Sequence, residues 1–188
     1  SILDFGSGNG SFLYYFINKY NLSNNYSFEI SKPLIKFQKK FIRKTFFFKT
    51  QHLNLRILSR FNKSNILVDY SMMNSVAQYF YNNYYFEQVI EFLIHKTKKK
   101  ILIYDIKNHD LKFLYKETVR MRQNLSKRDF NKKYKNTPIR FYKKLYIKKF
   151  LEKIKKKYVF DYSFIKLPQS ATDHKFGFCL LIEKKNIK

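Results

Sequence analysis

Cysteine is almost absent from this chain of 188 residues, which contains only one, Cys179. A single thiol cannot build an internal disulfide framework or a zinc site made of thiolates. The four histidines are scattered, and no two of them stand at the spacing of metal ligands. We therefore expect neither a disulfide-stapled fold nor a metal centre.

Long apolar runs are missing as well. No run approaches the roughly 18 residues that a membrane-spanning helix needs, and residues 1–4 have neither the basic flank nor the apolar stretch of a signal peptide. These absences predict a cytoplasmic protein without a membrane span. Apolar residues still make up 45% of the chain and aromatic residues 20%, which is enough for one globular domain spanning residues 1–188.

Acidic residues are few, because 13 Asp and Glu face 39 Lys and Arg, for a net charge of +26. Taken alone, this charge points to nucleic acid or to an anionic membrane surface. Arginine, the better reader of phosphates and bases, is scarce, and the lysine excess is also expected from an AT-rich coding sequence. The lysines are spread along the chain and are densest at 96–100 and 143–157. The charge alone therefore does not favour an anionic macromolecular partner.

Short apolar runs alternate with amphipathic stretches along most of the chain. The pattern predicts strands at 2–5, 26–30, 45–48, 66–68 and 101–106, and helices at 12–20, 31–41, 86–94, 110–125 and 146–154. The helix at 31–41 would bury Leu34, Phe37 and Phe41, the lysines at 96–100 would close the third helix, the fourth strand would end at 69–71, and 126–138 would be a loop.

The last two apolar runs, at 158–164 and 176–182, follow each other without a helix between them. They therefore read as an antiparallel pair that extends one edge of the sheet. The whole order predicts an α/β fold: a doubly wound, Rossmann-like sheet of mostly parallel strands, with helices on both faces and an antiparallel C-terminal pair.

Glycine is scarce, and three of the four glycines stand together as Gly6, Gly8 and Gly10, directly after the first strand. A ligand laid against a strand-to-helix turn needs residues without a Cβ. The cluster therefore favours a nucleotide-like cofactor at the switch point of the sheet. A dinucleotide fingerprint fits poorly, because Asn9 or Ser11 stands where its third glycine belongs.

The segment Asp4-Phe5-Gly6-Ser7-Gly8-Asn9-Gly10 resembles the Asp-x-Gly-x-Gly-x-Gly motif of class I S-adenosylmethionine-dependent methyltransferases at all four defining positions. The resemblance implies S-adenosyl-L-methionine as cofactor, with Asp4 helping to hold its amino acid end and Glu29 accepting hydrogen bonds from the ribose. The cofactor contacts implied in this way are Asp4, Gly6, Ser7, Gly8, Gly10, Glu29, Ile30, Tyr70 and Ser71.

The order of elements is similar to that family along nearly the whole chain. Residues 69–76 lie where the family's fourth strand runs into the loop beneath the transferred methyl, and Gln78-Tyr79-Phe80 follows as in many small-molecule members. The family often binds adenine with an acid after the third strand, where this chain offers Gln51, His52 and Asn54. The family also has a helix or two before its first strand, so a fragment lacking an N-terminal cap helix is one interpretation of this chain.

Methyl transfer from a sulfonium is an in-line displacement that needs alignment of the acceptor and, for a poor nucleophile, a base. Asp105, at the end of the clearest buried strand, and His109 just after it are the first candidates for that base. Both have plainer interpretations, Asp105 as a cap of the following segment and His109 as a solvated loop residue. Tyr70 and Tyr142 are weaker candidates.

Two classes of acceptor are disfavoured. Methyltransferases acting on exocyclic amines of bases, or on glutamine, resemble one another in an Asn/Asp-Pro-Pro-aromatic segment after the fourth strand, and this chain has no proline there. Methylation of carbon-5 of a base needs a cysteine nucleophile, whereas Cys179 lies in the last strand as a core residue. A small molecule, glycan or lipid is the leading acceptor. The alternatives are an RNA methyltransferase that grips phosphate with lysines at 127–135 and 143–157, and a binding protein that keeps the fold without turnover. Against the first, the lysines at 143–157 also suit the solvated side of a helix that packs Tyr146, Phe150 and Ile154.

Overall fold

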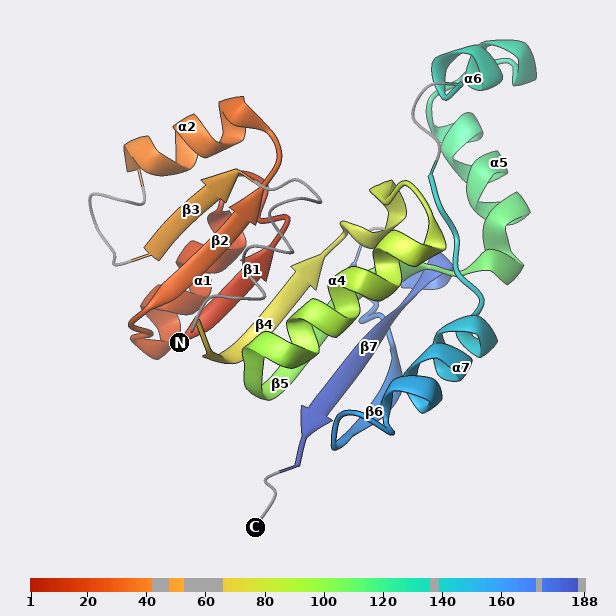
Figure 1. Cartoon of the computed structure of the whole chain (residues 1–188). Coiled ribbons are helices and arrows are strands. Elements are labelled where there is room, and N and C mark those ends of the chain that lie inside the picture. The colour runs from red at the N-terminus through yellow and green to blue at the C-terminus, as the bar shows by residue number, and fades with distance from the viewer. Residues whose placement is uncertain (42–47, 53–65, 136–138, 172–173, 186–188) are drawn as a thin grey trace.

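The computed structural model describes residues 1–41, 48–52, 66–135, 139–171 and 174–185. Within these ranges the chain forms a seven-stranded sheet with helices on both faces (Figure 1). The strands are β1 Ile2–Phe5, β2 Asn25–Glu29, β3 Phe48–His52, β4 Val68–Asn74, β5 Thr97–Lys107, β6 Phe160–Lys166 and β7 Gly177–Lys184. The helices are α1 Ser11–Tyr20, α2 Lys32–Phe41, α4 Asn83–Lys96, α5 Lys112–Arg122, α6 Lys127–Lys133 and α7 Lys144–Ile154.

The strand order is β3-β2-β1-β4-β5-β7-β6. The pairs among the first five strands are parallel, whereas β7 pairs antiparallel with both β5 and β6. Parallel neighbours need a crossover connection, which α1 supplies between β1 and β2, while β6 and β7 have no helix between them and pair antiparallel. The predicted Rossmann-like sheet with an antiparallel C-terminal pair is confirmed.

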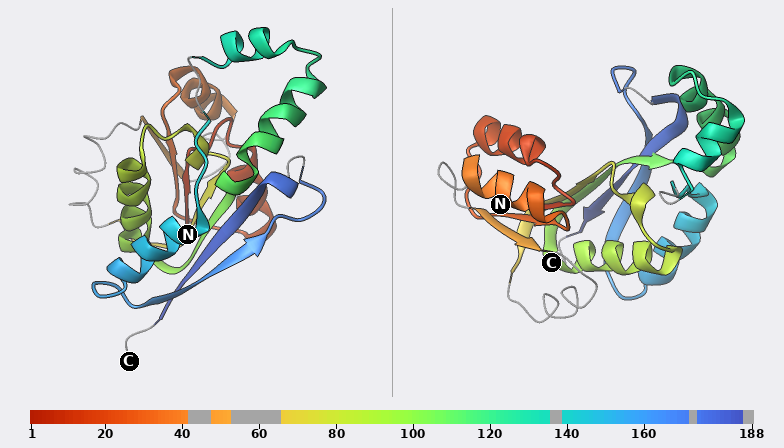
Figure 2. Two further views of the ribbon diagram at one scale, coloured as in Figure 1. Left: turned by 90° about the vertical axis from the view of Figure 1, so that its right-hand side faces the viewer. Right: turned by 90° about the horizontal axis from the view of Figure 1, so that it is seen from above.

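Alternation along β1 divides the core between the two faces of the sheet. Leu3 and Phe5 point into a large apolar cluster under α4 and α7, and Ile2 points into a smaller cluster with Leu13 and Ile17 of α1. Figure 2 shows α1 and α2 together on one face and α4 and α7 on the other. The predicted helix at 146–154 is confirmed as α7, which buries Ile147, Phe150, Leu151 and Ile154 and leaves most of its lysines exposed.

The fourth strand continues further than the sequence pattern predicts. Its pairing with β5 runs through Met72 and Met73 to Asn74, which lies opposite Tyr104. The strand therefore ends at 74 instead of 69–71, because the two methionines are ordinary strand residues with partners on β5. The third strand begins at Phe48, where the prediction ended it, and residues 45–47 of the predicted strand lie outside the described residues.

Two lysine-rich segments differ from the prediction. Helix α4 ends at Lys96, and residues 97–100 open β5, where Lys100 pairs with Glu183 of β7 at 2.6 Å. The predicted loop at 126–138 contains α6, whose N-cap is Ser126: its Oγ accepts from the backbone N–H of Asp129 and donates to the Asp129 carboxylate. The buried side chain of Phe130 packs this short helix against the rest of the protein.

Candidate active site

A cavity of about 390 Å³ lies at the carboxyl ends of β1, β2 and β4. It is lined by Phe5, Gly6, Gly8, Phe28, Glu29, Ile30, Asn74, Ser75, Val76, Tyr79, Phe80 and Tyr85. Doubly wound sheets bind ligands at this edge, and the volume lies within the range of about 300–1,000 Å³ common for small-molecule sites. The structure thus brings Gly6, Gly8, Glu29 and Ile30 of the predicted contacts to one cavity.

The glycine loop is shaped by two different requirements. Gly6 and Gly8 both have left-handed backbone angles, with φ of 79° and 57°. A Cβ on Gly6 would lie 2.4 Å from Cγ2 of Val76, so the loop approaches the segment after β4 too closely for any side chain. A Cβ on Gly8 would meet no atom within 4 Å, because this position opens toward the cavity. Gly6 is therefore required by packing, and Gly8 keeps room for a ligand.

Glu29, the last residue of β2, holds the loop and also faces the cavity. Its Oε2 accepts from the backbone N–H of Gly8 at 2.8 Å, and its Oε1 accepts from the N–H groups of Ile30 and Ser31, each at 2.8 Å. An ionised carboxylate offers about four acceptor positions. Three backbone donors therefore leave capacity for a ligand hydroxyl on this buried carboxylate.

A buried polar network fixes the loop from behind, and sequence reasoning missed its central residue, Gln38 of α2. The Gln38 amide donates to Ser7 Oγ at 2.8 Å and to the Gly8 carbonyl at 2.6 Å, while its carbonyl accepts from Ser27 Oγ at 2.9 Å. Gln38 is fully buried, whereas Phe37, predicted to face inward, is 46% exposed. A glutamine in a lysine-rich helix gives no sequence signal that its side chain is buried, which is why the sequence pattern indicated Phe37 rather than Gln38 for the buried face. Ser7 thus lies within the site as a support of the loop.

Asp4, predicted to hold the amino acid end of the cofactor, is 1% exposed and does not line the cavity. Its Oδ1 has no hydrogen-bond partner among the described residues. Burial, with the negative charge of Glu29 as a smaller contribution, raises the pKa of Asp4 to about 8. Desolvation penalises the charged form, so burial favours the protonated carboxyl of Asp4. Gly10, also predicted, precedes α1, and its N–H donates to the Ser7 carbonyl at 2.8 Å.

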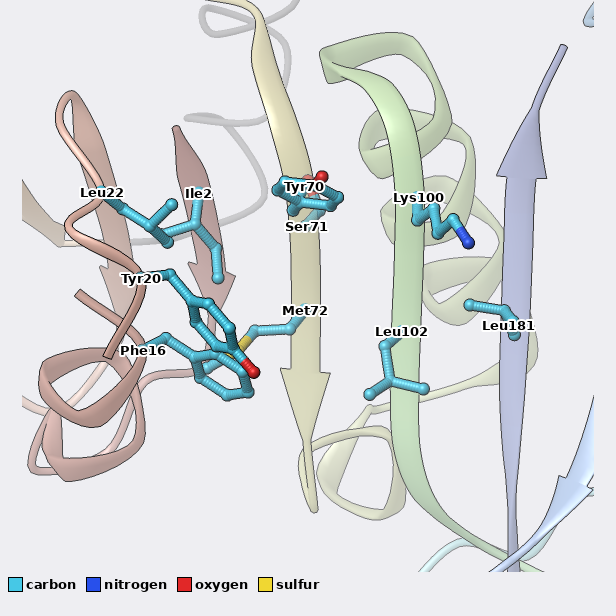
Figure 3. A pocket seen from close by; sticks show the side chains of 10 residues that line it. All are labelled: Ile2, Phe16, Tyr20, Leu22, Tyr70, Ser71, Met72, Lys100, Leu102 and Leu181. Carbon is cyan, nitrogen blue, oxygen red and sulfur yellow. The ribbon is translucent and has the colours of Figure 1, made fainter. Parts of the chain in front are cut away.

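Tyr70 and Ser71 are not brought to this cavity, because they lie inside β4 rather than at its end. They line a second cavity of about 460 Å³ on the α1 side of the sheet, together with Ile2, Phe16 and Tyr20 (Figure 3). Ser71 Oγ is hydrogen-bonded to Thr97 at 2.5 Å. Because β4 extends to residue 74, Asn74 and Ser75 line the first cavity instead. The sequence offered one sign of this, a polar pair directly after the two methionines.

Asp105 interrupts β5 with a left-handed φ of 59°, at the point where pairing with β7 shifts register. One carboxylate oxygen accepts from Ser75 Oγ at 2.9 Å, and the other binds Lys107 Nζ at 2.9 Å. Ser75, whose φ of 54° is also left-handed, lines the cavity at the ends of β1, β2 and β4. A strained backbone is common at functional sites. Asp105 thus touches the cavity wall through Ser75, with both oxygens engaged by donors.

His109, the second candidate base, does not line the cavity. Its side chain is 45% exposed, and the nearest carboxylate is that of its neighbour Asp110, at 3.9 Å from Nδ1. Tyr142, a weaker candidate, is buried, and its hydroxyl donates to the Ala77 carbonyl at 2.8 Å. Burial holds the pKa of Tyr142 far above its ordinary range. Its contacts are those of a structural residue.

Neither a metal site nor a cysteine nucleophile is supported by the residues that the structure describes. No group of three or more His, Cys, Asp or Glu is placed there to hold a metal ion. Cys179 is buried in β7, and burial raises the pKa of its thiol, which disfavours the nucleophilic thiolate. The described helices include none long and apolar enough to cross a membrane. Of the adenine candidates, Gln51 and His52 belong to β3, and Asn54 lies outside the described residues.

A scan against protein-family models finds no match, and a search of curated proteins finds no similar sequence. Solved structures with the same fold are found readily. One is the plantazolicin methyltransferase BpumL in complex with a triazolic desmethylPZN analog and SAH, with a TM-score of 0.72 and 14% identity over 98% of this chain and 76% of that one.

Two further structures have the same fold. The methyltransferase domain of bacterial CtHen1-C gives a TM-score of 0.65 at 10% identity, covering 98% of this chain and 88% of that one. An S-adenosylmethionine-dependent methyltransferase from Clostridium acetobutylicum ATCC 824 gives 0.66 at 11% identity, covering 98% and 84%. The chain therefore has the fold of class I S-adenosylmethionine-dependent methyltransferases, as the glycine motif implied.

Proposed function

We propose that this chain is an S-adenosylmethionine-dependent methyltransferase that transfers a methyl group to a small-molecule, glycan or lipid-type acceptor. The observation that carries the proposal is that the glycine loop and Glu29 line the same cavity. The open side of Gly8 leaves room for a nucleoside, and the Glu29 carboxylate keeps acceptor capacity for ribose hydroxyls. The SAH bound to the plantazolicin methyltransferase BpumL supports the same cofactor.

The residues proposed for cofactor binding follow from the cavity. Glu29 would accept from the ribose, and Gly6, Gly8 and Ile30 would contact the cofactor through their backbone. Asn74 and Ser75, at the end of β4, replace Tyr70 and Ser71 as the proposed contacts from this strand, because Tyr70 and Ser71 line the other cavity. Ser7 and Gly10 support the loop from the protein side through the bonds to Gln38 and to the Ser7 carbonyl. The cofactor supplies an electrophilic methyl, and the chain would align an acceptor beside it.

For the reaction itself, Asp105 is better suited to positioning than to proton abstraction. Its two oxygens bind Ser75 and Lys107, so it orients the Ser75 hydroxyl at the cavity wall. Helix α7 weakens the case for RNA, because its buried face packs on the core and its lysines form the solvated side, as the plainer interpretation predicted.

Variants of Glu29 test the cofactor assignment. Glu29→Ala should weaken the binding of S-adenosylhomocysteine by about 1–3 kcal/mol, the loss typical of hydrogen bonds to a charged group. Glu29→Gln keeps the size of the side chain, so it separates loss of charge from loss of packing. Glu152→Gln, at an exposed position of α7, is the matched control. Unchanged affinity in Glu29→Ala, measured by calorimetry on folded protein, would contradict the assignment.

A further inference from the structure

Asn74 ends β4 and Ser75 follows it, and both residues line the cavity that holds the glycine loop and Glu29. The backbone of Ser75 is left-handed, with a φ of 54°, which is uncommon for a residue other than glycine. Its N–H donates to the Tyr104 carbonyl of β5 at 3.1 Å. The neighbouring strand therefore fixes the place of the Ser75 side chain in the cavity wall.

The proton of the Ser75 hydroxyl is donated to the protein. Ser75 Oγ donates to Asp105 Oδ2 at 2.9 Å, and Asn74 Oδ1 lies 3.3 Å from the same Oγ. A hydroxyl has one proton and two acceptor lone pairs, and the carboxylate is the stronger of these two acceptors. Among the residues that the structure describes, none donates to Ser75 Oγ. Ser75 therefore offers a ligand in the cavity an acceptor and not a donor.

Asp105 holds this arrangement because its second oxygen is engaged as well. Oδ1 accepts from Lys107 Nζ at 2.9 Å, and the Lys107 side chain is 3% exposed. An ammonium can only donate hydrogen bonds, so Lys107 occupies one oxygen and leaves the other to the Ser75 proton. The two charges of the pair balance each other. Asp105 thus acts at the cavity wall by directing the Ser75 proton rather than by attracting a cation.

Glu29 and Ser75 lie on either side of the glycine loop. Strands β2 and β4 flank β1 in the sheet, so the end of β2 and the end of β4 are separated by the loop that follows β1 (Figure 1). Both residues line the same cavity, and Gly6 of the loop between them has no side chain. A nucleoside whose ribose binds Glu29 can therefore extend its 5′ substituent along the loop toward Ser75.

The 5′ substituent of S-adenosylmethionine ends in an amino acid, whose ammonium needs oxygen acceptors where water is excluded. Asp4 does not supply one, because it is 1% exposed and does not line the cavity. Of the described residues that line the cavity, only Glu29 is an acid, and it lies on the other side of the loop. Ser75 Oγ and Asn74 Oδ1, 3.3 Å apart, are two acceptors that one ammonium can bridge.

We propose that Ser75 and Asn74 bind the ammonium of the cofactor's amino acid end, and that Asp105 is the positioning residue that keeps Ser75 an acceptor. The inference rests on the proposed function and deepens it by assigning a second group of the cofactor to named side chains. One N–H of the ammonium donates to Ser75 Oγ and another to Asn74 Oδ1. The end of β4 thus takes the role that the sequence motif gave to Asp4.

Calorimetric titration with S-adenosylhomocysteine and with its 2-oxo analogue, in which a ketone replaces the ammonium, tests this assignment. The two ligands share the adenosine, the thioether and the carboxylate. The wild-type chain should bind S-adenosylhomocysteine about tenfold more tightly, as is typical of a hydrogen bond that involves a charged group. Ser75→Ala should remove most of that preference by weakening S-adenosylhomocysteine alone. Ser163→Ala, at an exposed position of β6, is the matched control and should keep the preference.

Asp105→Asn tests the positioning role through the same ratio of affinities. Lys107 would donate to the new amide oxygen, which turns the amide NH₂ toward Ser75. The hydroxyl would accept from that NH₂ and turn its own proton to the cavity. This variant should therefore bind the 2-oxo analogue at least as tightly as S-adenosylhomocysteine, whereas a purely structural Asp105 would lower both affinities alike. Ser75→Ala leaves the Asp105–Lys107 pair in place and tests the ammonium contact independently.

Equal affinities of the wild-type chain for the two ligands, or equal losses for both in Ser75→Ala, would overturn the ammonium contact. An unchanged ratio of affinities in folded Asp105→Asn would overturn the positioning role. A wild-type chain that binds neither ligand would contradict the cofactor assignment and this inference with it. Saturable binding of both ligands with equal affinity would contradict the inference alone, so the two failures are distinguishable.

Discussion

Alanine at Gly6 should mainly destabilise the fold and alanine at Gly8 should mainly weaken ligand binding, although the two glycines are separated by one residue and both have left-handed backbone angles. The backbone angle costs either alanine about 1 kcal/mol. At Gly6 the new Cβ would also lie 2.4 Å from Val76, and relief of such overpacking costs about 1–3 kcal/mol. We therefore expect Gly6→Ala to lose about 2–4 kcal/mol of unfolding free energy and Gly8→Ala about 1 kcal/mol.

Binding should rank the two variants differently. Gly8 lines the cofactor cavity and a Cβ there meets no protein atom, so we expect Gly8→Ala to fold but to lose most of its affinity for S-adenosylhomocysteine by occupying ligand space. Urea unfolding followed by circular dichroism gives the stabilities, and calorimetry gives the affinities. Equal stability of the two variants, or wild-type affinity in Gly8→Ala, would refute this reasoning about the loop.

Three further perturbations test the groups around the loop and the cavity wall. Because folding raises the pKa of Asp4 from an ordinary 3.8 to about 8, the folded chain keeps a proton that the unfolded chain releases. The contribution of Asp4 to the free energy of unfolding is therefore largest below about pH 4 and is lost as the pH rises to about 8. Urea unfolding at a series of pH values should show a smaller decrease with pH for Asp4→Asn than for the wild type. Gln38→Leu removes the bonds to the loop and should weaken S-adenosylhomocysteine binding about tenfold by calorimetry, with Gln88→Leu on α4 as the control. Asp105→Asn removes the carboxylate that pairs with the buried Lys107 ammonium at 2.9 Å and should cost about 3 kcal/mol in urea unfolding. A second substitution, Lys107→Met, should recover part of that loss, and no recovery would argue against the ion pair.

The glycine loop and Glu29 were predictable because their signals are local. Glycines concentrated after an apolar strand mark a tight turn, and an acid at the end of the next parallel strand must lie beside that turn. Asn74 and Ser75 were missed because Met72 and Met73 are compatible with both a strand and a loop, and only pairing with β5 decides between them.

Long-range packing hides the remaining parts of the site from the sequence. Gln38 looks like a surface residue until the fold places it behind the loop, where Ser7 and Ser27 satisfy its amide. Helix α6 was missed in the same way, because Phe130 is a single apolar residue in a lysine-rich segment whose periodicity is too weak to predict a helix. Local patterns therefore predict the fold and the front of the cavity, whereas the supports behind it arise from tertiary contacts.

Calorimetric titration of the wild-type chain with S-adenosylhomocysteine, beside a parallel titration with NADH, tests the central claim most directly. The open Gly8 and the Glu29 carboxylate predict saturable binding of S-adenosylhomocysteine. The loop lacks the third glycine of a dinucleotide fingerprint, so we expect no binding of NADH. Saturable binding of NADH alone would contradict the methyltransferase assignment and would assign the glycine loop to a dinucleotide instead.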